Sequence, residues 1–324
     1  MSSTAAVPAD KTVLVIAGPT ASGKTALALQ VAEKLGGTVI NADSMQVYRE
    51  LRILTDRPSE AEEARVPHRL FGVLRAAERG SVAWWRDAAS REIDAALEFG
   101  RLPVLCGGTG LYLNALMRGI ADVPPVPQEV VAQAIARYAE LGGAAFKEEV
   151  TAMDPVLGAR LEPGDSQRLQ RAWAVARATG RPLSDWQAQP TGGRDDLRYC
   201  RVLLFPPRPV SADAVEARFR RMVEEGAVEE VRRLAARGLD RSLPAMRAIG
   251  VPQLIDYIDG KSSLDDAVSA SVIATRQYAK RQRTWFRHQF VSDIRMDAQF
   301  SKSRFQEIFS EIRTFMLTPR ILSD

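Results

Sequence analysis

Short apolar runs alternate with segments of helical spacing over the first part of the chain. Three runs have the length and composition of buried parallel strands: Val13–Ala17, Thr38–Asn41 and Leu102–Cys106. Helical patterns separate them, at Thr25–Leu35 and at Ser81–Phe99, the latter with Ser81 as its expected N-cap. Strand–helix alternation of this kind predicts an α/β fold with a parallel sheet, which binds ligands at the carboxyl ends of its strands.

A cluster of prolines, Pro124, Pro125 and Pro127, interrupts this alternation. From Glu129 to Gln187 the pattern is helical only, and a strand-like run returns at Tyr199–Phe205. We therefore expect an all-helical insertion domain at residues 121–197. Residues 1–120 and 198–324 would then form the α/β core that carries it.

The last third of the chain is mainly helical in pattern. Helices are expected at Ala212–Arg237, Val251–Ile258 and Leu264–Arg287. Ser263 and Asp266 have the spacing of a capping box at the start of the last of these. The tail beyond Ala298 has amphipathic character and indicates no function.

Composition narrows the class of protein. The chain has no apolar run of about 18 residues and no signal-peptide pattern at its start, so neither a membrane partner nor secretion is expected. Cys106 and Cys200 are its two cysteines, which favours a reducing, cytoplasmic compartment without disulfides. His68 and His288 lie far apart, and no Cys/His spacing indicates a zinc site. The net charge of +4 is compatible with an anionic partner.

The strongest chemical signal is a G-x-x-x-x-G-K-T motif between the first strand and the first helix. A chance glycine-rich turn is disfavoured because strand, loop and helix occur in the required order. The backbone N–H groups of such a loop bind phosphate, the lysine adds a charge and the threonine hydroxyl binds Mg²⁺. The motif predicts a diphosphate or triphosphate ligand without specifying a nucleotide. Its residues are Gly18, Pro19, Thr20, Ala21, Ser22, Gly23, Lys24 and Thr25, with Thr25 as the metal ligand.

An acidic residue follows the second strand and not the third. A P-loop kinase or ATPase needs a strand that ends in a metal-binding carboxylate, whereas Leu102–Cys106 continues into Gly107–Gly110. Asp43 stands just past Thr38–Asn41, so it is expected at the same edge of the sheet as the P-loop. There it could accept a proton from a nucleophile. An N-cap or an indirect metal contact are the alternatives for this residue.

Several further segments follow in order along the chain: Pro67–Leu70, Gly107–Tyr112, Asp165–Arg171, Arg218–Met222, Arg247–Gly250 and Ala274–Gln282. Together with the P-loop and Asn41–Tyr48, they resemble the tRNA dimethylallyltransferases from Val13 to about Gln289. Members of this family attach an isoprenoid to the exocyclic amine of the adenine 3′ to the anticodon. The plant adenylate prenyltransferases share the P-loop and the Asp43 segment, but the helical insertion and the basic C-terminal helix fit the tRNA branch better.

The resemblance implies a substrate pair, a cofactor and roles for individual residues. Dimethylallyl diphosphate would bind with Mg²⁺, Asp43 would be the general base, Arg218 would clamp the departing diphosphate, and Thr109 would contact the reacting adenine. A cytoplasmic monomer is expected. Contacts to the anticodon stem-loop of tRNA are implied for Asp43, Ser44, Met45, Gln46, Gln167, Arg168, Leu169, Gln170, Arg171 and Arg247.

Two segments depart from the family pattern. The family commonly has Gly-Thr-Ala-Lys-Pro where this chain has Leu54-Thr-Asp-Arg57-Pro58. It often has Gly-Tyr followed by Arg or Lys where this chain has Gly250-Val251-Pro252. For that reason Arg247 is included among the expected tRNA contacts, and Val251 and Pro252 are not.

Spacing alone indicates a basic stripe on the last long helix. Arg276, Lys280, Arg283 and Arg287 are four, three and four residues apart and would share one helical face. Val272, Ala279 and Phe286 recur every seven residues and would form the buried side. No Asp or Glu occurs from Ala267 to Ser292, whereas a merely solvated face usually carries both signs of charge. We therefore expect the stripe to bind tRNA phosphates.

Two other classes of protein share part of this evidence. A P-loop kinase for a small metabolite would explain the loop, but it lacks the metal-binding strand. A non-catalytic RNA-binding protein with a vestigial loop would explain the basic stripe, but Lys24, Thr25 and Asp43 are all intact.

Overall fold

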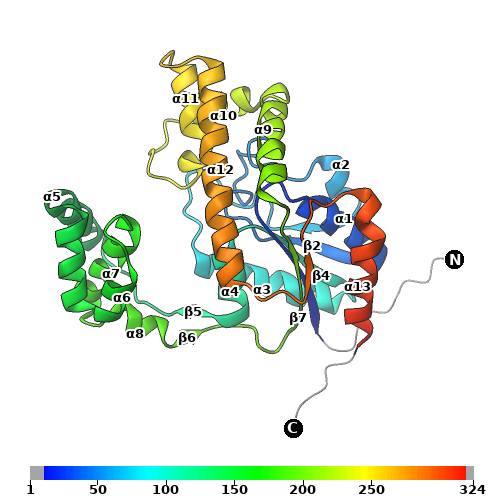
Figure 1. The fold of residues 1–324 in the computed structure, drawn as a ribbon, viewed down its shortest axis with the longest axis horizontal. Helices are drawn as coiled ribbons and strands as arrows, with labels where there is room; N and C mark the ends of the chain where they lie inside the picture. The colour runs from blue at the N-terminus through cyan, green and yellow to red at the C-terminus, as the bar shows by residue number, and fades with distance from the viewer. Residues whose placement is uncertain (1–10, 319–324) are drawn as a thin grey trace, which may run out of the picture. The chain divides into compact units, whose positions relative to one another are not determined.

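The computed structural model describes residues 11–318 and divides into two compact units. The first unit comprises the chain up to Leu113 together with the chain from Asp195 onward, and the second is Asn114–Arg194 (Figure 1). The insertion was expected at residues 121–197. Over residues 11–318, no helix combines the length and the apolar character needed to cross a bilayer.

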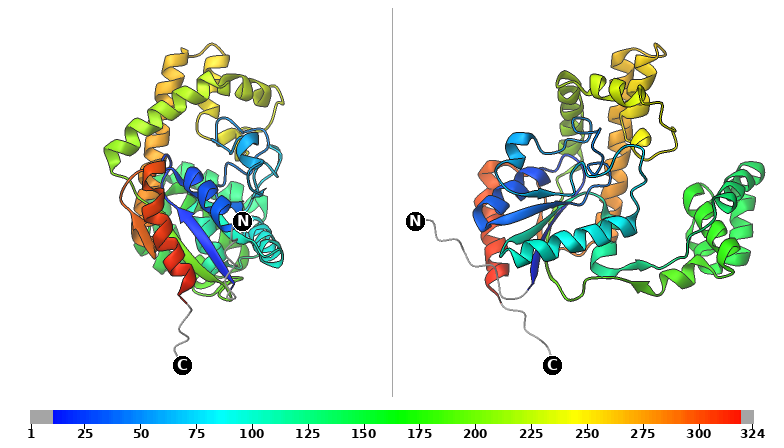
Figure 2. Two further views of the ribbon diagram at one scale, coloured as in Figure 1. Left: turned by 90° about the vertical axis from the view of Figure 1, so that its right-hand side faces the viewer. Right: turned by 180° about the vertical axis from the view of Figure 1, so that it is seen from behind.

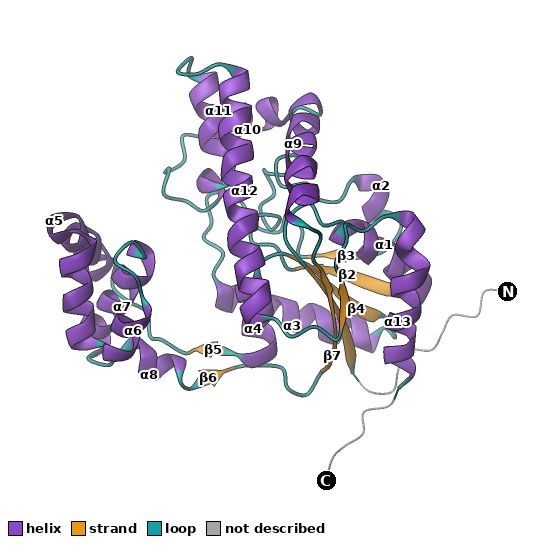
Figure 3. Ribbon diagram, in the orientation of Figure 1, coloured by secondary structure: helices purple, strands orange, loops and turns teal. Residues whose placement is uncertain are grey.

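A six-stranded, wholly parallel sheet forms the centre of the first unit (Figure 3). Its strand order is β3-β2-β4-β1-β7-β8. The α/β fold class predicted from the sequence is thereby confirmed. The two edge strands, β3 and β8, were not predicted because they are too short to show a period. The strands are β1 (Thr12–Ala17), β2 (Gly37–Asn41), β3 (His68–Arg69), β4 (Leu102–Gly107), β7 (Arg198–Leu204) and β8 (Ile294–Met296).

Helices pack on both faces of this sheet (Figure 2). Leu14 and Ile16 pack in one apolar cluster with α1 (Lys24–Leu35) and α13 (Phe305–Leu317). On the other face, α3 (Val82–Glu98) packs on β2 and β4. Its Trp85 is fully buried, stacks on Tyr112 and donates a hydrogen bond to the carbonyl of Asn41. Ser81 caps α3 as predicted. The C-terminal tail, to which no function was assigned, thus contributes α13 to the core.

The prediction for the remaining helices of this unit was wrong at one place. The sequence predicted a single helix over Ala212–Arg237, but Gly226 adopts a φ of 105° and separates α9 (Arg208–Glu224) from α10 (Ala227–Ala235). Such a left-handed conformation suits glycine and ends a helix. The capping box of Ser263 and Asp266 is confirmed at the start of α12. The elements of this unit also include α2 (Glu60–Glu63), η1 (Ala245–Arg247), α11 (Val251–Ile258) and α12 (Leu264–Gln289).

The second unit is helical, with one small strand pair that was not predicted. Phe146 and Trp173 lie in its apolar core. Asp154 is buried and accepts hydrogen bonds from the backbone N–H groups of Leu157 and Ser184. The α5 helix has a non-helical break at Gly142. Its elements are α4, which begins in the first unit (Gly110–Arg118), β5 (Ile120–Ala121), α5 (Gln128–Met153), α6 (Pro155–Arg160), α7 (Ser166–Thr179), α8 (Leu183–Gln187) and β6 (Pro190–Thr191).

Candidate functional site

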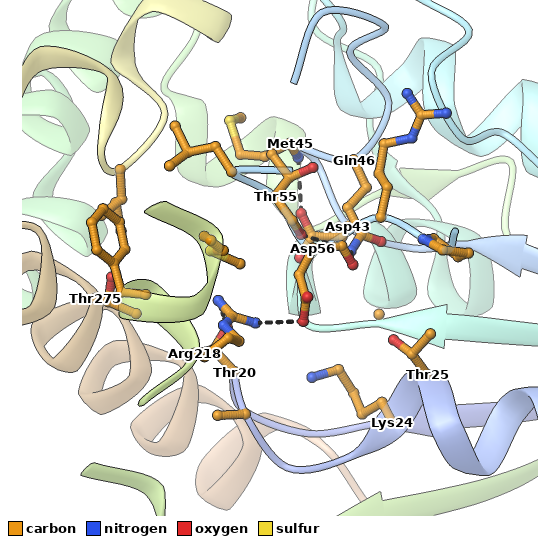
Figure 4. Close-up of a pocket in the computed structure, with 18 of the residues that line it drawn as sticks. Thr20, Lys24, Thr25, Asp43, Met45, Gln46, Thr55, Asp56, Arg218 and Thr275 are labelled. Atoms are coloured by element: carbon orange, nitrogen blue, oxygen red, sulfur yellow. Dashed lines mark hydrogen bonds and ion pairs between the residues drawn. The ribbon is translucent and has the colours of Figure 1, made fainter. Parts of the chain in front are cut away.

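A pocket of about 710 Å³ opens at the carboxyl ends of β1, β2 and β4 (Figure 4). Most of the glycine-rich loop (Gly18–Thr25) forms one wall. The aspartate segment (Asn41–Tyr48) and the loop Leu51–Pro58 form another, and side chains of α9 and α12 face them. The strand order reverses direction at β1, where a parallel sheet leaves a crevice for ligands. The pocket is therefore where the fold predicts one.

The glycine-rich loop is closely packed from behind. Gly18 has a φ of 155°, and a Cβ atom there would lie 2.3 Å from the carbonyl oxygen of Leu204. Gly23 has a φ of 88°, and a Cβ atom would lie 2.8 Å from that of Phe300. Larger residues would force the loop forward into the pocket. The Ser22 hydroxyl is buried and has no hydrogen-bond partner among residues 11–318, so a donor in the loop lacks an acceptor.

Lys24 reaches into the pocket and donates a hydrogen bond of 2.8 Å to the carbonyl of Pro19. The protein packed around its ammonium group desolvates it and lowers its pKa from 10.5 to about 8. The nearby carboxylate of Asp43 opposes this shift, and the guanidinium of Arg218 adds to it. A bound anion would supply the charge that water no longer provides.

Hydrogen bonds from Asn41 fix the start of the aspartate segment. Its side chain is fully buried, accepts from the N–H of Asp43 at 2.8 Å and donates to the Asp43 carbonyl at 2.9 Å. The Asp43 carboxylate accepts from the N–H of Met45 at 2.9 Å through Oδ1. Its Oδ2 has no hydrogen-bond partner in the part of the chain that the structure describes, so it is available for a proton.

Thr109 holds the aspartate segment from behind. Its hydroxyl accepts from the N–H of Ser44 at 3.0 Å and donates to the Ser44 hydroxyl at 3.3 Å. Thr109 does not line the pocket, whereas Ser44, Met45 and Gln46 do. Its observed contacts therefore position the segment that carries Asp43.

Arg218 projects from α9 toward the glycine-rich loop. Its two terminal nitrogens lie 3.4 Å from the Asp56 carboxylate and 3.5 Å from the Thr20 hydroxyl. The predicted diphosphate residues Lys24 and Arg218 thus line one pocket with Asp43. Arg247, in η1, lines it as well.

The basic stripe differs from its prediction at one position. Arg283 is buried, its Nη1 donates to the carbonyl of Pro206, and its guanidinium lies 4.1 Å from the centre of the Phe205 ring. It is four residues from Ala279 and three from Phe286, so it belongs to the buried side of α12 that those residues define.

The other three stripe residues are exposed, and one has an acidic partner. Arg276, Lys280 and Arg287 face solvent. Arg276 lies 3.1 Å from Glu216 of α9, an acid that the sequence of α12 alone could not reveal. Of these three, Lys280 and Arg287 have no ion-pair partner among residues 11–318.

The remaining predicted tRNA contacts lie in the second unit, on α7. Gln167, Arg168 and Arg171 are exposed and Gln170 is half-buried. Leu169 is fully buried in the core of that unit, so it cannot contact RNA at the surface as predicted. Its place in the motif reflects packing.

Comparisons with known proteins assign the chain to a family. The IPP transferase family profile matches residues 46–289. The chain belongs to the IPP transferase family. A tRNA dimethylallyltransferase of Rhodospirillum centenum is 55% identical over 295 residues, which cover 90% of this chain and 93% of that protein. The tRNA dimethylallyltransferase of Granulibacter bethesdensis is 48% identical, over 94% of this chain and 99% of that one.

Solved structures of other IPP transferases agree with this assignment. The tRNA isopentenylpyrophosphate transferase of Bacillus halodurans is 32% identical, covers 95% of this chain and 97% of its own, and has a TM-score of 0.67. A eukaryotic dimethylallyltransferase acting on tRNA is 24% identical over 97% of this chain and 82% of its own, with a TM-score of 0.80, which supports the fold. The resemblance inferred from the motifs is confirmed, and this IPP transferase is an enzyme that transfers a group.

Three residues that build this IPP transferase site were not predicted. Gln282 of α12 is buried, accepts from the N–H of Thr20 at 2.8 Å and donates to the carbonyl of Gly108 at 2.9 Å. Glu230 of α10 is buried and accepts from three consecutive N–H groups of the loop Leu51–Pro58. Asp56 lies on that loop. Gln282 stands within a family motif, and Asp56 marks a departure from one, so each had a sequence signal. Glu230 had none.

The lowered pKa of Lys24 predicts a pH-dependent affinity for diphosphate esters. Below pH 8 the ammonium is charged and attracts the ligand. Above pH 8 it is neutral in the free protein and must take up a proton on binding. The affinity for an alkyl diphosphate should therefore fall as pH rises through about 8. Calorimetric titration with methyl diphosphate from pH 7 to 9.5 measures this, and Lys24→Gln should bind weakly with a flat profile. The same fall in Lys24→Gln would assign the titration to another group.

Proposed function

We propose that this enzyme transfers a dimethylallyl group from dimethylallyl diphosphate to the exocyclic amine of the adenine 3′ to the anticodon in tRNA, with release of diphosphate. One observation carries the proposal. A carboxylate with an unpaired oxygen, Asp43, shares a pocket with a lysine and a glycine-rich loop suited to diphosphate. The names of close relatives as tRNA dimethylallyltransferases support it.

The phosphate side of the pocket fits a magnesium diphosphate. The N–H groups of the glycine-rich loop, the Ser22 hydroxyl and the Lys24 ammonium are donors for its oxygens. Residues 11–318 contain no group of three or more acidic, histidine or cysteine side chains that could hold a metal unaided. Mg²⁺ commonly keeps waters and binds through few protein ligands together with substrate phosphates. The Thr25 hydroxyl would hold the ion in this way, and the ion would neutralise part of the diphosphate charge.

The transfer breaks the allylic C–O bond and forms a C–N bond to the adenine amine. The amine becomes acidic as it attacks, and the Oδ2 atom of Asp43 takes its proton. Asn41 holds the backbone of Asp43, and the N–H of Met45 holds its carboxylate, in place for this step. General-base assistance of this kind contributes typically about 10²–10⁴-fold. Lys24 and Arg218 stabilise the charge that develops on the departing diphosphate.

The tRNA would bind through phosphate contacts and through the extruded adenine. Lys280 and Arg287 on α12 suit the phosphates of the anticodon stem-loop, and so do Arg168 and Arg171 on α7. The adenine must leave its stack to reach the allylic carbon, which an anticodon loop permits at low cost. We place the adenine beside Asp43, Ser44 and Met45, with Thr109 behind them. A cytoplasmic location as a monomer accords with a tRNA substrate.

A single assay separates this function from its rivals. The protein is incubated with Mg²⁺, labelled dimethylallyl diphosphate and an anticodon stem-loop RNA that carries the adenine, with a guanine-substituted RNA as control. Parallel reactions contain AMP as acceptor, or ATP as donor. Label should enter the adenine-containing RNA alone. Transfer to AMP alone would indicate an adenylate prenyltransferase, and RNA-independent consumption of ATP with a small molecule would indicate a kinase.

Asp43→Asn should retain both substrates and lose turnover. Asparagine keeps the shape and the hydrogen bond to Met45, but it cannot accept the proton. Single-turnover rates should fall by about 10²-fold or more, while the dissociation constants of RNA and diphosphate change little. A rate within a few-fold of the wild type would show that Asp43 is structural.

The exposed part of the basic stripe should set the salt dependence of tRNA binding. Lys280→Gln combined with Arg287→Gln removes two phosphate contacts. The slope of log affinity against log salt should become shallower by about one to two units. The control is Lys261→Gln, since Lys261 is an exposed lysine that lies 2.8 Å from Asp259. An unchanged slope in the double variant would leave tRNA binding to other surfaces.

A further inference from the structure

Asp56 is an acid at the wall of the pocket in which we propose that the diphosphate binds. Its Oδ2 lies 3.4 Å from Arg218 (Figure 4). Its Oδ1 lies 3.2 Å from Arg221, and both arginines are on α9. It also lies close enough to Lys24 to favour the charged ammonium. Its charge opposes that of a diphosphate for the same cations.

The loop that carries Asp56 is fixed without help from its side chain. The side-chain amide of Gln46 donates to the carbonyls of Thr55 and Asp56, both at 3.0 Å. Glu230 accepts from the N–H groups of Arg52, Ile53 and Leu54 at 2.7–2.9 Å. The carboxylate is thus presented to α9 by a pre-formed backbone, which removal of its charge would leave intact.

The contacts of Arg218 are long for its charge. Charge-assisted N–H···O bonds are usually about 2.7–2.9 Å long. Arg218 instead lies 3.4 Å from Asp56 and 3.5 Å from the Thr20 hydroxyl. The side chains of Arg218 and Asp56 are 22% and 39% exposed, which further weakens their attraction. A ligand with more charge and better geometry can therefore take Arg218 from Asp56.

We propose that Asp56 is an internal competitor of the diphosphate. In the free enzyme its carboxylate pairs with Arg218 and Arg221. When the diphosphate binds, Arg218 exchanges Asp56 for a phosphate oxygen. The carboxylate returns when the diphosphate leaves. Asp56 therefore weakens diphosphate binding, and it favours release of the product after transfer. The proposal rests on the function proposed above, because it requires a diphosphate in this pocket.

The test is the affinity for inorganic diphosphate of the wild type and of Asp56→Asn, measured by calorimetry with and without Mg²⁺. Asparagine is suited to this position, where φ is 56°, because it tolerates left-handed backbone. Asp56→Asn should bind diphosphate about 3- to 10-fold more tightly in both conditions. In steady-state assays, inhibition by product diphosphate should strengthen by the same factor, and KM for dimethylallyl diphosphate should fall.

Glu225→Gln provides the matched control. Its carboxylate lies 3.4 Å from the same Arg221 but makes no contact with Arg218. Neutralising it removes an equal charge at the pocket edge, so it should change the affinity by much less.

Five outcomes would overturn the proposal. Weaker binding by Asp56→Asn in both conditions would make Asp56 a support for Arg218, and weaker binding in Mg²⁺ alone would make it a metal ligand. An equal increase in diphosphate affinity in Glu225→Gln would show that the effect comes from net charge and not from the position of Asp56. Unchanged binding by Asp56→Asn would remove any role in affinity. If wild type binds no diphosphate, the proposed function fails as well.

Discussion

Just past the end of β2, the backbone of Ala42 packs closely against Gly107 at the end of β4, and the site is built from this contact. A Cβ atom on Gly107 would lie 2.2 Å from the carbonyl carbon of Ala42, so no larger residue fits there. The N–H of Ala42 donates to Cys106, and the N–H of Thr109 donates to Ala42. These bonds fix Asp43 at the level of the glycine-rich loop. Any widening of this contact would separate Asp43 from the glycine-rich loop.

Around that contact, the pocket holds more positive charge than its acids balance. Six basic side chains line it against four acidic ones: Lys24, Arg57, Arg218, Arg221, Arg247 and Arg281 against Asp43, Asp56, Glu62 and Glu225. Among the basic groups, Lys24 is desolvated and Arg218 lies 3.4 Å from its acidic partner, Asp56. Burial of charge is costly unless it is compensated. The free enzyme tolerates this arrangement through partial pairing, and the ligand completes the compensation. Under the proposed function, the affinity for the diphosphate would arise from charge that the free protein leaves uncompensated.

Local patterns predicted most of the fold. The strand, loop and helix around the P-loop motif, the Ser81 cap and the capping box of Ser263 depend on neighbouring residues, and the sequence displays those directly. The α/β class followed from their alternation. The helical spacing of α12 could also have predicted that Arg283 is buried, because it lies on the same side of the helix as Ala279 and Phe286. The sequence therefore contained two conflicting signals for Arg283, its spacing from buried residues and its place in a run of basic residues, and the prediction followed the second.

Contacts between distant residues could not be predicted. Gln282 binds Thr20 across 262 positions and Glu230 binds Arg52 across 178, so no pattern within either segment announces the bond. Glu216 opposes Arg276 from another helix for the same reason. In each case the residue type was unremarkable in its own helix. The contact that each residue makes forms only when the fold brings two distant segments together.

The helix break at Gly226 makes the pocket wall possible. In one continuous helix, Arg218 and Glu230 would be separated by about 18 Å along the axis, at 1.5 Å per residue. Here they bind a single loop, at Asp56 and at Leu54, two residues that an extended chain separates by about 7 Å. The turn at Gly226 thus lets α9 and α10, which are consecutive in the sequence, bind the same loop from two positions. A glycine that does not itself line the pocket thereby sets the width of the site. Variation at this turn is a route by which the pocket can change size while the side chains that line it stay the same.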